Sequence, residues 1–274
     1  EFYQYDCCFR NSMLKITKGC DLVYHTAATA YEGLSVFSPH LITNNIVTGS
    51  VSLFSAAIEN KVKRIVFCSS MARYGTNKLP FREDFTPKPQ DPYGIAKVAA
   101  EDILKNLCEV HNVEYVIAVP HNIIGPRQKY DDPFRNVVSI MINRMMQGKA
   151  PIIYGDGNQT RCFSYIDDCL SCLLPMLDQK DLNKQIINIG PDEEFVTINK
   201  VAELCSNVTG INLPPIYKKD RPQEVKHAIC SADKARQLLN YKTKVSLKEG
   251  IQRTFDYIKK RGVKPFEYHI DLEI

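Results

Sequence analysis

The stretch that decides the fold reads KRIVFCSS at residues 63–70 and continues, after a loop, as DPYGIAKVAAEDILKNL at residues 91–107. The first part is an apolar run that ends in two serines, which is typical of a buried parallel strand. In the second part Pro92 stands where a helix would begin, and the apolar residues after it keep helical spacing. Tyr93 and Lys97 therefore project from one helical face about a turn apart. Because ligands bind at the carboxyl ends of strands in doubly wound sheets, Ser70 is placed to meet Tyr93.

These side chains predict a site for proton transfer. A neighbouring ammonium favours phenolate, so we expect Lys97 to lower the pKa of Tyr93 from about 10 toward neutrality. Such a tyrosine would serve as a general base for an alcohol. The Tyr-x-x-x-Lys spacing also occurs on ordinary amphipathic helices, where the tyrosine packs and the lysine is solvated. The serine pair upstream favours the catalytic interpretation.

Strands and helices alternate along the rest of the chain. Short β-rich runs at residues 21–25, 64–69, 115–120 and 185–189 are separated by stretches long enough for crossover helices. This pattern predicts an α/β fold with a Rossmann-type, doubly wound parallel sheet. After Gly125 we expect loops, a helix at 137–146 and a strand at 151–154, which would build a smaller, interleaved C-terminal substrate domain. The predicted division is 1–124, with a later contribution from about 160–190, and 125–274.

Composition limits the class of protein. The 274 residues are 44% hydrophobic, and no run approaches the roughly 20 apolar residues of a membrane helix. The net charge of +4 is small and dispersed, which argues against a nucleic-acid partner. Cys169 and Cys172 have C-x-x-C spacing, but no second pair follows, so we expect no metal site. The ten cysteines indicate core thiols in a reducing compartment, the cytoplasm by default.

Several motifs occur in one order and together resemble the extended short-chain dehydrogenase/reductase family, within it the NAD-dependent nucleotide-sugar epimerases and dehydratases of the UDP-glucose 4-epimerase kind. The resemblance runs from about Asp21 almost to the C-terminus. The family's Gly-rich phosphate turn is missing, so we expect the chain to begin near the third strand of such a sheet. Besides the Ser, Tyr and Lys constellation, the motifs are DLVYHTAA (21–28), NIVTGS (45–50), SSMARYG (69–75), NIIGPR (122–127), IYGDG (153–157) with Arg161, NIG (188–190) and RPQE (221–224).

The resemblance implies two ligands. NAD would be held by Asp6, as the acidic residue at the adenine end, and by Thr26, Ala27, Ala28, Asn45, Tyr93, Lys97 and His121. The second ligand would be a nucleoside diphosphate sugar, with the diphosphate near arginines whose planar fork suits phosphate oxygens. The implied substrate residues are Ser70, Met71, Tyr93, Asn122, Asn136, Ile153, Tyr154, Arg161, Arg221, Glu224 and Ala228.

The reaction expected from the resemblance is inversion at sugar carbon 4, with Ser70, Tyr93 and Lys97 as catalytic residues. Dehydratases of the family carry an acidic residue just after the serine, whereas Met71 and Ala72 follow Ser70 here. The small Ala228 leaves room for an N-acetyl group, so UDP-glucose, UDP-galactose and the N-acetyl forms are all expected substrates. A dehydratase, an NAD(P)-dependent keto-sugar or hydroxysteroid reductase and a non-catalytic dinucleotide-binding regulator remain alternatives. A homodimer is the expected assembly, since it is the commonest symmetric state.

Overall fold

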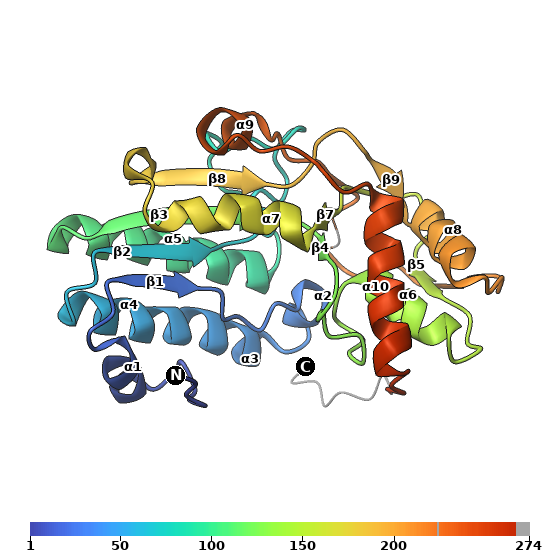
Figure 1. Cartoon of the computed structure of the whole chain (residues 1–274), viewed down its shortest axis with the longest axis horizontal. Helices are drawn as coiled ribbons and strands as arrows, with labels where there is room; N and C mark the ends of the chain where they lie inside the picture. Colours follow the sequence, from blue (N-terminus) through green and yellow to red (C-terminus); the bar gives the residue numbers. More distant parts are fainter. Residues whose placement is uncertain (224, 267–274) are drawn as a thin grey trace.

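A computed structural model describes residues 1–223 and 225–266 of the chain. Its centre is a parallel sheet of β1 (Leu22–His25), β2 (Arg64–Cys68), β3 (Glu114–Pro120) and β8 (Gln185–Ile189), in the order β1-β2-β3-β8 (Figure 1). Each strand lies within a residue or two of its predicted range. The strands form because most of their side chains are apolar, and the interior residues of the central β2 and β3 are buried on both faces.

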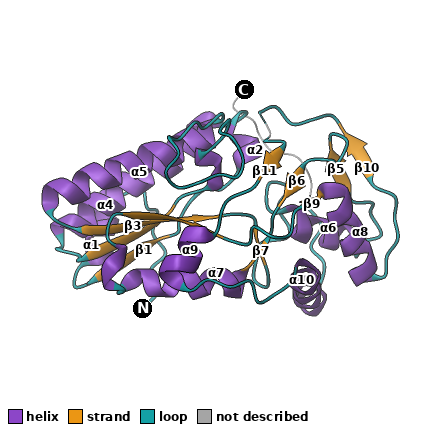
Figure 2. Ribbon diagram, turned by 90° about the horizontal axis from the view of Figure 1, so that it is seen from above, coloured by secondary structure: helices purple, strands orange, loops and turns teal. Residues whose placement is uncertain are grey.

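Helices cover both faces of this sheet (Figure 2). On one face α1 (Arg10–Thr17), α4 (Gly49–Glu59) and α5 (Pro92–His111) bury Ile65 and Phe67 of β2. On the other face α7 (Ile166–Leu173) and α9 (Asp233–Leu239) bury Val66, the residue between them. Alternate residues of β2 thus pack in the two apolar clusters on opposite faces of the sheet, which confirms the doubly wound α/β prediction.

A continuous helical stretch precedes β2. It consists of α3 (Pro39–Thr43), the π-helical turn η1 (Asn44–Thr48) and α4, and its length and mean hydropathy of 1.4 meet the requirements for a membrane span. Half of that window is buried inside the molecule, however, because α4 packs on α1, α5 and β1. The stretch therefore has the packing of a core helix that covers the sheet.

The second half of the chain adds a smaller packed unit. Its apolar cluster lies between α6 (Val137–Met145), α8 (Ile198–Thr209) and α10 (Leu247–Arg261). Short strands pair beside these helices: β4 (Ile123–Ile124) with β7 (Ser164–Tyr165), β5 (Ile152–Tyr154) with β10 (Ile216–Lys218), and β6 (Thr160–Arg161) with both β9 (Val196–Thr197) and β11 (His227–Ala228). The remaining short helices are α2 (Glu32–Ser35), η2 (Met71–Arg73), η3 (Leu174–Leu177) and η4 (Lys180–Leu182).

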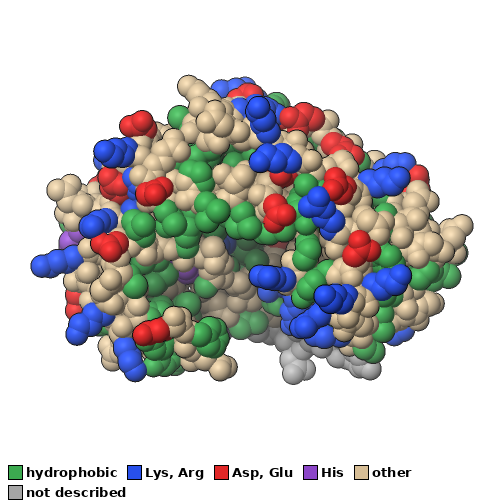
Figure 3. All heavy atoms as spheres, in the orientation of Figure 1, with side chains coloured by type: hydrophobic (Ala, Val, Ile, Leu, Met, Phe, Trp, Pro, Cys, Tyr) green, Lys and Arg blue, Asp and Glu red, His purple; other side chains and the backbone are tan. Residues whose placement is uncertain are grey.

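The chain crosses between the two units more than once. After α6 and β5 it returns through α7 and β8 to the large sheet, leaves it again for α8, and returns once more at α9 (Figure 1). Cys230, just before α9, pairs with Phe81 beside the sheet. Figure 3 shows a hollow between the sheet unit and the unit that carries α10, on the face where the strands of the sheet end.

Candidate active site at the carboxyl ends of β1 and β2

The predicted serine and tyrosine meet at this edge. Asp91 caps α5 by accepting a hydrogen bond from Gly94 N at 2.9 Å, and Pro92 is the first residue of the helix. Together they place Tyr93 in the first helical turn. Ser70 caps η2 in the same manner, with its Oγ accepting from Ala72 N at 3.2 Å. The Ser70 hydroxyl faces the Tyr93 phenol and lowers the pKa of Tyr93, against the larger effect of burial. Two helix starts therefore hold the predicted pair together.

Lys97 lies one turn further along α5 and is 3% exposed. Its Nζ donates to the carbonyl of Cys68 at 2.8 Å and sits 4.9 Å from the centre of the Phe67 ring. Burial lowers the pKa of Lys97 to about 8, against opposing influences from Cys68 and Glu101. The lysine is therefore close to its titration point near neutral pH.

The structure corrects the expected pKa of the phenol. Burial raises the pKa of Tyr93 to about 12, and the Ser70 hydroxyl offsets this only in part. The reason is geometric: the Lys97 ammonium points to the Cys68 carbonyl, so desolvation of the phenolate prevails over attraction by that cation. In this arrangement Tyr93 holds its proton.

The residues expected at the cofactor lie around this site. Thr26 and Ala27 form an exposed turn directly after β1, and Ala28 follows as a partly buried residue. Asn45 donates from Nδ2 to Thr29 Oγ1 at 2.8 Å, which ties η1 to the loop after β1. The backbone of β1 is thus accessible at its carboxyl end, with small side chains beside it.

His121 follows β3 and is 1% exposed. Its Nε2 lies 3.2 Å from the carbonyl of Pro191, while Nδ1 has no hydrogen-bond partner within the described residues. Gly190 must be glycine here, because a Cβ would lie 2.4 Å from His121 Nε2. Burial lowers the pKa of His121 to about 4, so the ring is neutral.

Asp6 lies on an exposed segment before α1. Its Oδ1 accepts from Cys8 N at 2.8 Å, and Cys8 Sγ in turn lies 4.0 Å from Asn45 Oδ1. Residues 1–9 form no strand, so nothing in this segment corresponds to the expected third strand. Asp6 is nevertheless close to the turn-and-helix region that carries Asn45.

These features fit the nicotinamide and ribose end of NAD. The Lys97 ammonium has three N–H donors, and within the described residues one of them binds Cys68 O. The other two Lys97 donors suit ribose hydroxyls. Nδ1 of His121, which is buried and has no partner within the described residues, is a further polar atom that could bind a ligand. The exposed Thr26 and Ala27 turn offers the close backbone approach that such a cofactor needs.

On the substrate side, Arg221 lies between Tyr154 of β5 and Gly33 of α2. Its Cζ lies 4.0 Å from the centre of the Tyr154 ring, and a Cβ placed on Gly33 of α2 would be 3.5 Å from its Cδ. Arg161 lies on β6 and donates from Nη1 to the carbonyls of Thr160 and Lys226, at 2.9 and 3.1 Å. Two guanidinium groups thus come from the smaller unit.

Asn122 and Met71 lie side by side. Asn122 has a left-handed backbone (φ 43°), and its Nδ2 donates to Cys162 O at 2.9 Å and lies 3.9 Å from Met71 Sδ. The amide of Asn136 is engaged at both ends, accepting from Val138 N and donating to Ile123 O. A helix-capping role therefore accounts for Asn136.

The last predicted substrate residues differ in accessibility. Ile153 is 1% exposed in β5, so only its backbone is positioned for a ligand. Ala228 is buried in β11 opposite Arg161 and packs in the apolar cluster of the large sheet. Glu224 lies outside the described residues.

Two charged residues that act on Tyr93, Glu32 and Arg135, were not predicted. Arg135 Cζ lies 4.7 Å from the centre of the Tyr31 ring, and the Tyr31 hydroxyl donates to Asp132 at 2.5 Å. These contacts join a turn before α2 to the loop before α6, and no local sequence pattern signals such a meeting.

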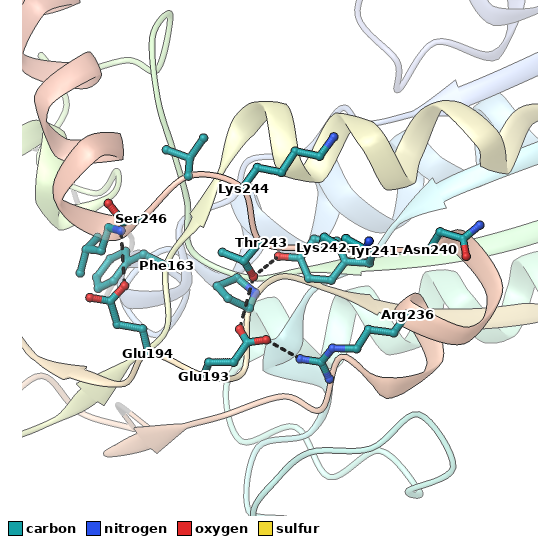
Figure 4. Close-up of a pocket in the computed structure, with 13 residues that line it drawn as sticks. Phe163, Glu193, Glu194, Arg236, Asn240, Tyr241, Lys242, Thr243, Lys244 and Ser246 are labelled. Carbon is teal, nitrogen blue, oxygen red and sulfur yellow. Dashed lines mark hydrogen bonds and ion pairs between the residues drawn. The ribbon is translucent and has the colours of Figure 1, made fainter.

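A cavity of about 770 Å³ lies elsewhere, between the loop after β8 and the loop before α10 (Figure 4). Arg236 in its lining pairs with Glu193 and with the adjoining Asp192, and Glu194 accepts from Leu247 N at 3.4 Å. None of the predicted site residues lines it. The chemistry of the Tyr93 site, not cavity size, therefore identifies the candidate active site.

Comparison with known proteins gives a consistent assignment. The profile of the "NAD dependent epimerase/dehydratase family" matches residues 1–190. A putative UDP-glucose 4-epimerase of Methanocaldococcus jannaschii is 34% identical over 246 residues, which cover 88% of this chain and 78% of that protein.

Solved structures agree with this assignment. The UDP-glucose 4-epimerase of Thermotoga maritima with UDP-glucose superposes with a TM-score of 0.88 at 32% identity, covering 95% of this chain and 84% of that one. The UDP-glucuronic acid 4-epimerase of Bacillus cereus, in complex with UDP-glucuronic acid and NAD, gives a TM-score of 0.88 at 28% identity and covers 96% and 82%.

Proposed function

This chain belongs to the NAD-dependent epimerase/dehydratase family, and from that premise we propose that it inverts carbon 4 of a nucleoside diphosphate sugar through a 4-keto intermediate. The observation that carries the proposal is that Ser70 meets the buried Tyr93, with the buried Lys97 one turn further along the same helix. The similarity to UDP-sugar 4-epimerases supports a UDP-sugar as the substrate.

In the proposed reaction, the Tyr93 oxygen takes the proton of the sugar 4-hydroxyl, and Ser70 hydrogen bonds to the same oxygen. Bound NAD would supply reversible hydride chemistry at carbon 4, so inversion requires the keto sugar to present its other face to the cofactor. Because burial holds the pKa of Tyr93 near 12, phenolate requires a cation nearby. Lys97 supplies that cation by turning from the Cys68 carbonyl toward the phenol.

The diphosphate would lie between the two guanidinium groups. Arg221 is positioned by Tyr154 on one side and Gly33 on the other, and Arg161 approaches from β6. Planar guanidinium groups form paired hydrogen bonds with phosphate oxygens. The sugar then extends toward Asn122, Met71 and Ser70, while Ile153 and Tyr154 border the base.

A dehydratase is the second candidate, because an acidic residue does approach the phenol from another element. Glu32 of α2 raises the pKa of Tyr93 by its charge, although Met71 and Ala72 after Ser70 carry no acid. The products separate the two reactions. An epimerase gives an isomer of unchanged mass, whereas a dehydratase gives a sugar that has lost water.

The direct test is to incubate the purified enzyme with NAD and UDP-glucose and to follow UDP-galactose by chromatography. We expect interconversion without net formation of NADH. Stoichiometric consumption of a reduced cofactor would indicate a reductase, and binding of NAD without turnover of any UDP-sugar would indicate a regulator.

Substrate size has its own test. We propose that Ala228 leaves room for an acetamido group at carbon 2, so the wild type should also act on UDP-N-acetylglucosamine. A tyrosine at this buried position would overpack it, at a cost of about 1–3 kcal/mol. Ala228→Tyr should suppress the N-acetylated reaction more than the UDP-glucose reaction. Equal loss on both sugars would show that Ala228 is only a core residue.

The assembly and the compartment are proposals as well. We propose a homodimer, on the general frequency of that state, and a cytoplasmic location, on the ten cysteines that are all free thiols in the structure. We also propose that residues 1–124, joined by about 160–190, bind the cofactor, and that 125–274 mainly bind the sugar nucleotide. Size-exclusion chromatography with light scattering tests the assembly.

A further inference from the structure

A third buried residue, Glu101, lies on the same face of α5 as Tyr93 and Lys97. Glu101 follows Lys97 by one helical turn and is 0% exposed. It lies beneath the catalytic pair, away from the hollow, and the mechanism above does not use it. A fully buried carboxylate is costly unless its partners compensate for the lost water, so its contacts are informative.

Glu101 binds both flanks of Ser70. The Ser69 hydroxyl, just before Ser70, donates to Glu101 Oε1 in a short hydrogen bond. Arg73, three residues after Ser70, donates from Nε to Oε1 at 3.0 Å and from Nη2 to Oε2 at 3.1 Å. Two tethers therefore run from one carboxylate on α5 to the strand end and to the 3₁₀ helix on either side of Ser70.

The ion pair between Arg73 and Glu101 is not explained by stability alone. Their side chains are 2% and 0% exposed, and a buried ion pair is often no more stabilising than apolar residues of similar volume. Its directional hydrogen bonds do, however, fix the distance between η2 and α5. Ser70 lies on one of these elements, and Tyr93 and Lys97 lie on the other.

We propose that Glu101 is a positioning residue for the epimerase reaction: it tethers the Ser70 segment to the catalytic helix and places a carboxylate one helical turn from Lys97. The inference rests on the proposed function for its kinetic consequences. The charge relation to Lys97 is independent of any reaction, since Glu101 stabilises the ammonium in the protein itself.

The charged and titratable groups around Lys97 determine whether its pKa rises or falls when Glu101 is replaced. The Cys68 thiol lies on β2, the His25 imidazole on β1, and Glu101 on α5, while Arg73 adds a cation behind Glu101. Replacing Glu101 by glutamine removes the negative charge but leaves Arg73 in place. Lys97 then loses a stabilising partner and faces an uncompensated cation, so its pKa falls below the present value of about 8.

The experiment compares Glu101→Gln with Asp168→Asn. Asp168 is 3% exposed and accepts from Lys244 N and Val245 N away from the site, so it controls for the loss of a buried carboxylate. The Lys97 amine is titrated by NMR in protein labelled at lysine Cε, with Lys97→Met for assignment. We expect the Lys97 pKa to fall by about 1 unit in Glu101→Gln and to stay unchanged in Asp168→Asn.

Kinetics supply the second readout. In Glu101→Gln we expect kcat to fall by at least about tenfold with little change in KM, and the alkaline limb of the kcat profile to move to lower pH. An unchanged Lys97 pKa together with a loss of melting temperature alone would overturn the positioning role. A wild type without epimerase activity would instead overturn the proposed function.

A second variant keeps the test decisive if Glu101→Gln does not fold. Ser69→Ala removes one tether and preserves the ion pair between Arg73 and Glu101. We expect a smaller fall in kcat, about threefold or more, with an unshifted alkaline limb. A kcat equal to that of the wild type would show that the tethers do not position Ser70.

Discussion

At the scale of single residues, the proton-carrying role of Tyr93 depends on its hydroxyl group. Tyr93→Phe keeps the ring in its buried site and removes the oxygen that faces Ser70. We expect turnover to fall by about 10² to 10⁴, the usual scale for a general base, with NAD still bound. Cofactor content from the absorbance of the denatured supernatant and initial rates measure the two effects, and near-normal turnover would rule out the assignment.

Single residues also show how far the sequence alone could lead. The spacing of Tyr93 and Lys97 and the serines at the end of an apolar run predicted which side chains meet. It did not predict that the Lys97 ammonium binds the Cys68 carbonyl, because that depends on a rotamer and on burial. The sign of the Tyr93 pKa shift was wrong for this reason. Glu101, by contrast, has the same helical spacing and was available in the sequence.

At the scale of elements, we expect the N-cap of α5 to affect kcat as well as the stability of the helix. Asp91→Ala removes the hydrogen bond to Gly94 N in the turn that carries Tyr93, and an N-cap is worth about 1 kcal/mol. Ser246→Ala removes the equivalent bond to Glu249 N at the start of α10, away from the site.

We therefore expect similar losses in unfolding free energy for the two cap variants but a fall in kcat for Asp91→Ala alone. Urea unfolding and initial rates provide the comparison. Equal kcat values would mean that packing, without the cap, is sufficient to hold Tyr93.

Elements with a strong local signal were predictable, and the others were not. β2 and β8 are short apolar runs, and α5 has both a proline start and an apolar period. Strands of two residues, such as β4 and β11, are too short to show a period of two. The contact between Tyr31 and Arg135 joins two loops that only the whole fold brings together.

At the scale of the whole molecule, two buried histidines should make stability depend on pH. Burial lowers the pKa of His25 to about 3 and that of His121 to about 4, whereas an unfolded histidine titrates near 6.5. As the pH falls below 6.5, these histidines become protonated in the unfolded state but stay neutral in the folded state. The free energy of unfolding therefore decreases with falling pH and is unaffected by these residues well above pH 6.5.

Each histidine should lower the free energy of unfolding by about 1.5 kcal/mol when the pH is lowered from 6.5 to 5. Urea unfolding at several pH values measures this slope, and His25→Gln should reduce it by about half. A slope unchanged by that substitution would show that other groups control acid stability.

The relation between the two units of the molecule gives the last prediction. Arg221 comes from the segment between β10 and β11, stacks on Tyr154 and reaches Gly33 on α2. Two residues further along, Gln223 O accepts a hydrogen bond from Gln90 Nε2 at 2.6 Å, a second link between this segment and the first half of the chain.

Arg221 therefore occupies the place where a diphosphate would contact both units. Arg221→Leu should raise the KM for the UDP-sugar by about 10- to 100-fold and leave NAD occupancy unchanged. Arg253→Leu is the matched control, because Arg253 also lies over a tyrosine ring, that of Tyr165 at 5.1 Å, and pairs with Glu249 on α10. If both variants bind the nucleotide sugar like the wild type, Arg221 only packs the two units together. A rise in KM confined to Arg221→Leu would assign the diphosphate to this arginine and locate the substrate between the two units.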